Sequence, residues 1–479
     1  MPLILPGNVA SALPTGYDID NSCRFNGTDE YMDLAHASSG STTTWTFSFW
    51  IKRGKLGAVQ RVYGCDNTAG SLDEYIFFDA NDLLKFNVTH SGGSEYLVTN
   101  RKFRDVSAWY HIVCTWDTTN ATEADRMRIY VNGTRETSFS SSSLPAEDLE
   151  CTQTCNSGTT FEIMRSAYGG GEQYVSGYLA EFIFCSNNAY AASNFGEFDE
   201  DSPTIWKPKA FGDSFGNAGF HFDFEASDNL GNDANGGTDA TEYNLAAANQ
   251  ATDTPTNNFC TMNPLDNFYQ EVNFSEGNNS IAKPSSPDNT SPSKGTIGLT
   301  AGKWYWELKC SVGATTSWLI GIGSTQVTAA GNYELGVNAN DYAYSANDGD
   351  IRSGGSESSY GDTYAAGDII GVALDLANSK LYFAKNGTWQ NSGDPTSGAT
   401  GTGATSITAV GSTINGHYFP SHSFWSGTGT ATTDYNFGGC PAFSISSGNA
   451  DGNGYGNFEY TPPSGYLAIC TKNLGSDGG

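Results

Sequence analysis

Hydrophobic and polar residues alternate along most of this chain with the two-residue period of a β-strand. In residues 45–52, the side chains of Phe47, Phe49 and Ile51 fall on one face and mostly polar side chains fall on the other. Residues 304–309 repeat the pattern with two tryptophans and a leucine on one face. No window carries a sustained helical stripe, and the nearest, 243–250, is too short to form a helix alone. The pattern predicts an all-β protein.

Two segments, 128–134 and 380–388, combine an alternating strand with the dipeptide Asn-Gly. Asn-Gly tolerates the positive φ values of a type I′ turn, so each segment is predicted to form a hairpin. Each one follows another strand-like segment that ends near an aspartate, 111–117 and 370–375. We therefore expect two antiparallel β-sandwiches in tandem.

Changes in composition divide the chain into segments. The apolar arm 1–16 is interrupted by Pro and Gly, and its Leu3, Ile4 and Leu5 favour docking on a partner over disorder. Residues 203–267 are poor in aromatic residues and rich in Asn, Asp, Ala and Thr, which indicates a long connector with one or two strands, the clearest at 219–224. The other segments are a first sandwich at 17–202, a second sandwich at 268–475 and a tail at 476–479.

The balance of charge narrows the class of partner. The 479 residues carry 52 acidic and 23 basic side chains, a formal net charge of −29, with the acids spread along the whole chain. Such a surface repels phosphate backbones, so nucleic-acid binding is not expected. The first residues lack the basic start of a signal peptide. No stretch approaches the roughly 20 apolar residues of a membrane span, so we expect a soluble chain made in a cytoplasm, with no membrane insertion.

The ten cysteines are dispersed from Cys23 to Cys470, and several lie inside strand patterns. We expect most of them to be small buried hydrophobic residues. Cys151 and Cys155 bracket a polar loop and are the exception: they could form a local disulfide, and the sequence leaves this open.

Sequence motifs extend the interpretation to known families. The segments 22–33, 45–52, 109–113, 129–133 and 177–182 follow the order seen in laminin G-like and pentraxin-like domains of the concanavalin A superfamily. The segments 302–307, 320–323, 367–375 and 381–387 resemble a SPRY domain. Both resemblances imply concanavalin A-like sandwiches, or jelly rolls.

The combination of these two domains with the segments 253–265 and 458–466 resembles virion proteins of tailed bacteriophages. That resemblance implies a structural protein at the virion surface, such as a tail fibre or head fibre, that adheres to a host glycan or protein receptor. Its partners would be other virion proteins and further copies of itself, and a trimer is the expectation by analogy with viral appendages. A capsid decoration or tail scaffold protein without a ligand, and a free glycan-binding protein, are the alternatives.

Catalysis is not expected. Glycosidases need two carboxylates at a defined separation, and the acidic run 197–202 lies after the last predicted strand of its sandwich without a second glutamate at that spacing. The chain has no Gly-x-Ser-x-Gly elbow and no His-Glu-x-x-His motif. The six histidines form no ligand spacing, and His417 and His422, the closest pair, are separated by Pro420.

Two kinds of binding site remain. The pentraxin resemblance implies calcium at the sandwich rim, with Asp73, Glu74 and Glu172 as oxygen ligands, although the loop around Glu172 offers one acid where the family pattern has several. For receptor or glycan contact, aromatic residues predicted on Gly-rich loops are the candidates, because a ring can stack on a sugar. These residues are Tyr168, Tyr174, Tyr342, Tyr344, Tyr360, Trp389 and Trp425.

Overall fold

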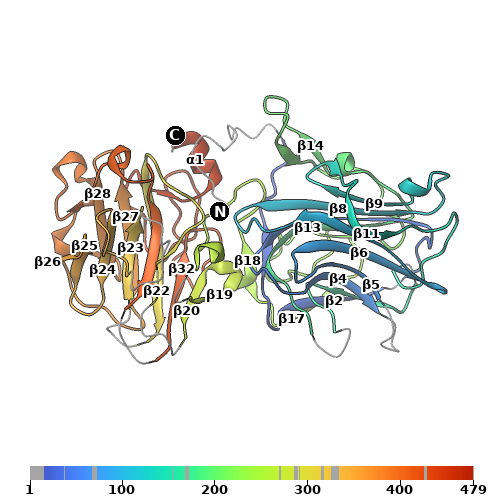
Figure 1. The fold of residues 1–479 in the computed structure, drawn as a ribbon, viewed down its shortest axis with the longest axis horizontal. Coiled ribbons are helices and arrows are strands. Elements are labelled where there is room, and N and C mark those ends of the chain that lie inside the picture. The colour runs from blue at the N-terminus through green and yellow to red at the C-terminus, as the bar shows by residue number, and fades with distance from the viewer. Residues whose placement is uncertain are drawn as a thin grey trace. The chain divides into compact units, whose positions relative to one another are not determined.

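The computed structural model describes residues 16–36, 38–66, 73–154, 156–167, 172–268, 271–284, 290, 292–313, 318–324, 334–425 and 429–477. It divides into two compact units (Figure 1), which we call the N-terminal unit, residues 14–256, and the C-terminal unit, residues 257–479. Leu3, Ile4 and Leu5 of the predicted docking arm lie outside the described residues.

The N-terminal unit is a sandwich of two antiparallel sheets. The first sheet has the order β10-β9-β8-β3-β13-β1-β18, with β16 also paired to β13. Its strands are β1 (Ser22–Asn26), β3 (Thr44–Arg53), β8 (Trp109–Asp117), β9 (Met127–Val131), β10 (Thr134–Arg135), β13 (Ser176–Ser186), β16 (Phe220–Phe222) and β18 (Gln250–Ala251).

The second sheet has the order β11-β7-β6-β5-β4-β12-β2-β17. Its strands are β2 (Tyr31–Ala35), β4 (Gln60–Asp66), β5 (Asp73–Phe78), β6 (Leu83–His90), β7 (Gly93–Lys102), β11 (Phe139–Ser143), β12 (Thr160–Ile163) and β17 (Thr241–Tyr243). The inward side chains of the two sheets meet in an aromatic core. For example, the ring centroids of Phe47 and Tyr63, from β3 and β4, are 4.3 Å apart.

The C-terminal unit is a second sandwich. One sheet runs β19-β20-β32-β22-β27-β28-β29, with β30 on β28 and a parallel β33 on β22, and the other runs β21-β31-β23-β24-β25-β26. The strands are β19 (Asn273–Ser275), β20 (Ser280–Lys283), β21 (Ser293–Lys294), β22 (Lys303–Val312), β23 (Trp318–Gly323), β24 (Asp341–Ser345), β25 (Asp350–Ser353), β26 (Ser356–Ser359), β27 (Ile369–Asp375), β28 (Lys380–Lys385), β29 (Thr388–Trp389), β30 (Thr405–Ser406), β31 (Phe419–Phe424), β32 (Ala431–Asn436) and β33 (Leu467–Ala468).

Helices contribute little to either unit. The α-helix α1 (Thr471–Asp477) lies at the end of the chain, and 3₁₀ turns occupy Glu123–Asp125, Ala192–Asn194, Ala247–Asn249, Pro264–Asp266, Glu276–Asn278, Gln390–Ser392, Pro395–Thr400 and Val410–Ser412. None of the helices in the described ranges is long and apolar enough to cross a membrane.

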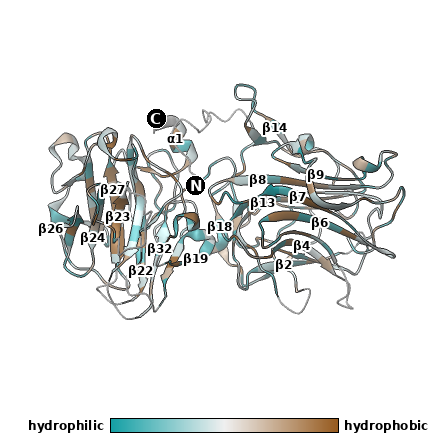
Figure 2. Ribbon diagram, in the orientation of Figure 1, coloured by the Kyte–Doolittle hydropathy of each residue, from teal (hydrophilic) through white to brown (hydrophobic). Residues whose placement is uncertain are grey.

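The predicted fold class, two antiparallel sandwiches in tandem, is confirmed. Figure 2 shows hydrophobic residues along the strands of both units.

Both Asn-Gly hairpins are present. Asn132 and Gly133 have φ values of 47° and 76°, and Asn386 and Gly387 have 48° and 77°, as a type I′ turn requires. In both turns the asparagine side chain also accepts a hydrogen bond from the preceding strand of the sheet, Asn132 from the His111 amide and Asn386 from the Ile369 amide, at 2.8 Å each.

The predicted connector is not a separate segment. Residues 203–256 belong to the N-terminal unit, where they supply the strands β15 (Trp206–Pro208), β16, β17 and β18. The expected strand at 219–224 is confirmed in part by β16, whose Phe220 and Phe222 enter the core. Residues 257–267 belong to the C-terminal unit. The prediction was wrong because strands of two or three residues leave too short a pattern in a polar sequence.

The cysteines are buried as expected. All nine cysteines within the described ranges are buried. Cys155 lies outside those ranges, so its bridge to Cys151 stays a prediction.

Candidate functional site

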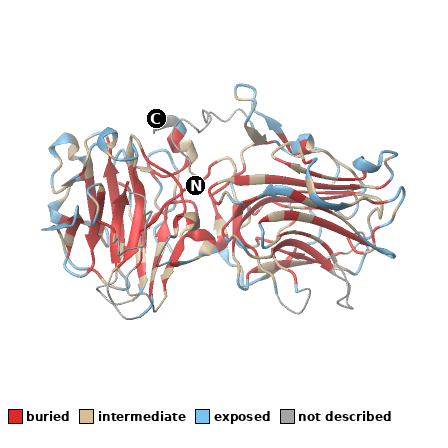
Figure 3. Cartoon of the chain, viewed as in Figure 1, coloured by how far each residue is buried: buried red, intermediate tan, exposed pale blue. Residues whose placement is uncertain are grey.

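The two sheets of the N-terminal unit differ in what lies over their outer faces. On the first sheet, Val113, Ile183 and Cys185 are buried beneath the segment 187–217, which packs Phe195 and other aromatic residues on them. On the second sheet, the outward-facing Tyr31, Tyr75, Lys85 and Tyr96 are half-buried and Tyr243 is exposed. Figure 3 shows buried residues interspersed with less buried ones along the strands of this unit. We call this surface the open face and define it by Tyr31, Arg61, Tyr75, Phe77, Lys85, Tyr96, Glu162, Arg165, Tyr174 and Tyr243.

Strand alternation decides which side chains reach the open face. Ile76 in β5 and Phe86 in β6 point into the core, so Tyr75 and Lys85, next to them in sequence, point outward. The register places Lys85 of β6 opposite Phe77 of β5. It places Asn87, two residues further along β6, between Tyr75 of β5 and Tyr96 of β7. Long side chains on adjacent strands are within reach of one another at such positions.

Cations and aromatic rings alternate across the middle of the open face. The Arg61 guanidinium carbon lies 4.5 Å from the Tyr75 ring centroid. Lys85 Nζ lies 5.4 Å from the Tyr75 centroid and 4.7 Å from the Tyr96 centroid, and it donates a hydrogen bond to the Tyr75 hydroxyl at 3.2 Å. Cation–π attraction fixes the rings and the charges relative to one another. The middle of the open face is therefore a row of rings with positive charges between them.

One end of the open face has a stacked pair of rings. Tyr31 and Tyr243 are parallel, with centroids 4.3 Å apart and an interplanar angle of 4°. Tyr243 is 38% exposed. The Arg165 guanidinium lies 4.1 Å from the Tyr31 centroid and pairs with Glu162 at 3.4 Å and with Glu172 at 3.6 Å. This end combines exposed rings with hydrogen-bonding charged groups.

The predicted contact residues fall in different places. Tyr174 lies at the end of the open face just described, 6.0 Å from the Tyr31 ring, and donates a hydrogen bond to Glu172 at 2.5 Å. Tyr168 lies outside the described residues. In the C-terminal unit, Trp389 and Trp425 are half-buried. Trp425 carries the Arg352 guanidinium 4.2 Å above its ring.

Three of the predicted contact residues are core residues, which corrects the expectation that they lie on exposed loops. Tyr342 and Tyr344 belong to β24, where every residue is buried, and Tyr344 packs 5.2 Å from Phe383 of the opposite sheet. Tyr360 is 9% exposed, and its hydroxyl accepts a hydrogen bond from the Phe383 amide. The neighbouring glycines suggested loops, but the aromatic residues pack between the sheets.

The expected calcium ligands have other partners. The Glu74 carboxylate is buried and accepts backbone N–H groups from Thr152, Gln153 and Thr154 at 3.1, 2.9 and 2.8 Å. Burial raises the pKa of Glu74 despite these hydrogen bonds, which lower it. Glu172 is engaged with Arg165 and Tyr174. The side chain of Asp73 lies outside the described residues. Glu74 therefore anchors a loop, and calcium binding at these residues stays a prediction.

One arginine lies at a second acidic group. Among the described residues, Asp348, Asp350 and Glu357 have carboxylate oxygens within 4.8 Å of one another. Arg352 lies at this group and pairs with Asp348 at 3.0 Å and with Glu357 at 3.2 Å. The acidic run at 197–202 is likewise paired, because Lys207 lies 3.5 Å from Glu197 and 3.6 Å from Asp199.

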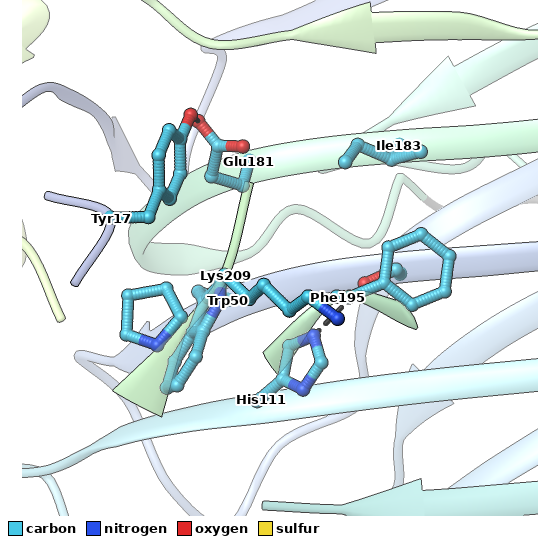
Figure 4. Close-up of a pocket in the computed structure, with 9 residues that line it drawn as sticks. Tyr17, Trp50, His111, Glu181, Ile183, Phe195 and Lys209 are labelled. Atoms are coloured by element: carbon cyan, nitrogen blue, oxygen red, sulfur yellow. Dashed lines mark hydrogen bonds between the residues drawn. The ribbon is translucent and has the colours of Figure 1, made fainter. Parts of the chain in front are cut away.

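A small pocket in the N-terminal unit holds a buried histidine (Figure 4). His111 Nε2 lies 2.9 Å from the Ser48 hydroxyl, and the Trp206 indole donates to His111 Nδ1 at 3.0 Å. Burial lowers the pKa of His111 to about 3, so its ring carries a single proton. Because an indole N–H can only donate, that proton is on Nε2 and points at Ser48. His111 cannot accept the serine proton, so the pair is not a nucleophile with its base.

Glu181 and Tyr17 also line this pocket and are hydrogen-bonded to each other. Glu181 has a φ of 48° where the pairing of β13 with β3 shifts register, and its carboxylate meets the Tyr17 hydroxyl at 3.2 Å (Figure 4) and His221 Nε2 at 3.0 Å. A bulge of this kind re-aims a side chain. Here it turns the carboxylate toward two internal partners.

Sequence reasoning missed most of the open face. Tyr75 and Lys85 lie in short strands where a cation or an aromatic residue occupies the polar position of the alternation. A cation or an aromatic residue at a polar position of the alternation is the sequence signal that could have identified Tyr75 and Lys85. Tyr243 could not be found this way, because it lies in the segment that was predicted to be a connector.

Comparisons with known proteins agree with this architecture. Residues 26–189 match the family model of the concanavalin A-like lectin/glucanases superfamily of the laminin G type, and residues 303–408 match that of the SPRY domain. No curated protein matches the chain.

Solved structures match one domain at a time. The SPRY domain of human HERC1 is 15% identical, with 38% of this chain and 99% of that chain covered and a TM-score of 0.28. A heptameric SAP-like pentraxin from Limulus polyphemus is 17% identical over 37% of this chain and 80% of that chain, with a TM-score of 0.28. Stonustoxin is 18% identical over 37% of this chain and 27% of its own length, with a TM-score of 0.26. The chain thus contains a concanavalin A-like domain of the laminin G type followed by a SPRY domain.

Proposed function

We propose that this protein is a non-catalytic adhesion protein that binds glycans on the open face of its N-terminal unit. The observation that carries the proposal is the row of half-exposed rings on that face, with Tyr31 and Tyr243 stacked at one end and Tyr75 and Tyr96 held by cations in the middle. Aromatic rings stack on the apolar faces of sugars, and nearby charged groups hydrogen-bond sugar hydroxyls. The outer face of the first sheet is covered and offers no such surface.

The carboxylates on and beside the open face favour a binding role over hydrolysis. Glu162 and Asp33 lie opposite each other on β12 and β2. Glycoside hydrolysis needs two carboxyl groups free to act on the scissile bond. Glu162 is engaged instead by Arg165 at 3.4 Å and by the Ala167 amide at 3.2 Å.

The proposal also includes a location at the surface of a virion. The resemblance to virion proteins of tailed bacteriophages supports a surface appendage that holds the glycan-binding unit toward a host cell and contacts other virion proteins. This part rests on the resemblance alone. Cryo-electron microscopy of a particle would test it: burial of the open face by neighbouring subunits would favour a decoration or scaffold role instead.

The glycan-binding proposal predicts that Tyr243→Ala weakens binding. A glycan array with the whole chain identifies a ligand, and calorimetry then measures its Kd. We expect about a fivefold loss of affinity, because an aromatic contact contributes about 1 kcal/mol. Phe198→Ala is the matched control, since Phe198 is 43% exposed in the same unit but lies outside the open face. Equal losses in both variants, or an array without any bound glycan, would contradict the proposal.

A further inference from the structure

We propose that the glycan is anionic, and that its carboxylate or sulfate group binds at Lys85 beside Arg61 in the middle of the open face. This inference rests on the proposed function and adds the chemical class of the ligand. It comes from the surroundings of Lys85, whose ammonium group lies between two aromatic rings, whereas the buried Lys52 and Lys294 are paired with carboxylates.

Lys85 is half-buried between two rings without a carboxylate partner among the described residues. Its Nζ has the Tyr75 hydroxyl as hydrogen-bond acceptor, at 3.2 Å, and the Tyr75 and Tyr96 rings as further neighbours. A hydroxyl and two π-faces stabilise an ammonium group but do not neutralise it. A charge withdrawn from water in this way gains most from an anion of opposite sign.

Buried lysines elsewhere in the chain show the contrast. Lys52 is paired with Asp253 at 2.7 Å, and Lys294 is paired with Asp266 at 2.9 Å. Arg165, at the end of the open face, is paired with Glu162 and Glu172. In a chain with 52 acidic and 23 basic residues, carboxylates are abundant. In the middle of the open face, Lys85 lies near the same Tyr75 ring as the buried Arg61, whose Nε donates a hydrogen bond to Gln173 at 2.7 Å.

The titration of Lys85 is consistent with an anion site. Burial lowers the pKa of Lys85, the Arg61 charge lowers it further, and Tyr96 opposes the shift. Tyr75, Tyr96 and Arg61, from the neighbouring strands β5, β7 and β4, are the titratable or charged groups that face it. A bound anion would stabilise the charged ammonium. Affinity for an anionic glycan should therefore fall as pH rises through the lowered pKa, earlier than an ordinary lysine would allow.

The test compares three probes on the whole chain: dextran, which is neutral, an alginate oligomer, which carries carboxylates, and a dextran sulfate oligomer. Non-specific attraction is suppressed, because a protein of net charge −29 repels polyanions. We expect the alginate or the sulfated probe to bind more tightly than dextran, and the one that binds identifies the anion. Lys85→Gln should weaken that binding about tenfold, which corresponds to about 1.4 kcal/mol.

Lys209→Gln is the matched control, because Lys209 is an exposed lysine in the segment 187–217, which covers the first sheet. It should leave all three affinities unchanged, and Lys85→Arg should restore binding by retaining the charge. Binding of dextran alone, or equal binding of all probes with no effect of Lys85→Gln, would overturn the anion site and leave the proposed function intact. Binding of none of the probes would overturn the anion site, and the glycan array then decides on the proposed function.

Discussion

Glu74 and Glu181 illustrate how single buried carboxylates fix segments of chain in the N-terminal unit. Glu74 gathers three backbone amides of one loop, and Glu181 joins Tyr17, near the start of the described chain, to His221 of β16. A hydrogen bond to a charged group contributes more than one between neutral groups. At the scale of residues, these carboxylates therefore hold a loop and an edge strand on the sheets.

The Glu181–His221 pair predicts a pH-dependent stability. Burial alone lowers the pKa of His221, but the hydrogen bond and charge of Glu181, with Asp223 and Asp233, outweigh it and raise the pKa above 6.5. A raised pKa in the folded state means that the stabilisation is complete below about pH 6.5 and is lost as pH rises through the folded pKa. The free-energy difference between wild type and His221→Gln should shrink over that interval.

Urea denaturation at pH 5.5, 7 and 8.5 measures this difference directly. Glu181→Gln removes the partner, so it should reduce the same pH-dependent difference. A constant difference between wild type and His221→Gln at all three pH values would contradict the assignment.

At the scale of elements, long strands with strict alternation could be predicted and short ones could not. The strand at 45–52 and both Asn-Gly hairpins were found because alternation and turn chemistry agree there. The strands β17 and β18, with three and two residues, carry no period, and their position is fixed by pairing with distant β2 and β1. The open face was missed for a related reason: it is assembled from single outward residues of several strands, which lie together only after the sheet forms.

The turn at Asn132–Gly133 gives a test of one element. Gly133 has a φ of 76°, and a Cβ added there would lie 2.2 Å from the Trp206 ring. Gly133→Ala should therefore destabilise the N-terminal unit through both backbone strain and overpacking, by about 2–5 kcal/mol in total. Gly236→Ala is the matched control, since Gly236 has a φ of 81° with nothing within 4 Å of its added Cβ.

Thermal or urea unfolding of the two variants separates the contributions. Gly236→Ala should show the backbone cost of about 1–2 kcal/mol alone. If the two variants lost the same stability, the packing of Trp206 against the turn would not matter to the fold.

At the scale of the whole molecule, each unit has its own core and is closed by its own last segment. Thr256 donates a hydrogen bond to the Ile19 carbonyl within the N-terminal unit at 2.8 Å. The Asn258 amide donates to the Thr471 hydroxyl within the C-terminal unit at 2.9 Å. Thr256 and Asn258 thus bond within different units, and the boundary between the units lies after Thr256. Composition predicted a different boundary, because the polar residues of 203–256 resemble a connector. In the structure they are held by backbone pairing and buried hydrogen bonds.

This boundary predicts that a fragment of residues 1–256 folds and a fragment of residues 1–202 does not. In the shorter fragment, buried Lys52 loses Asp253 Oδ2, which lies 2.7 Å away, and the Trp109 indole loses its acceptor Asp253 Oδ1 at 3.1 Å. Removing one partner of a buried ion pair costs about 3–5 kcal/mol, a large part of the 5–15 kcal/mol that stabilises a typical domain. Phe220 and Phe222 are lost from the core as well.

Near-ultraviolet circular dichroism and urea unfolding of the two fragments measure the difference. Asp253→Asn in the longer fragment isolates the ion pair, and a cooperative transition at the same urea concentration in both fragments would restore the connector interpretation.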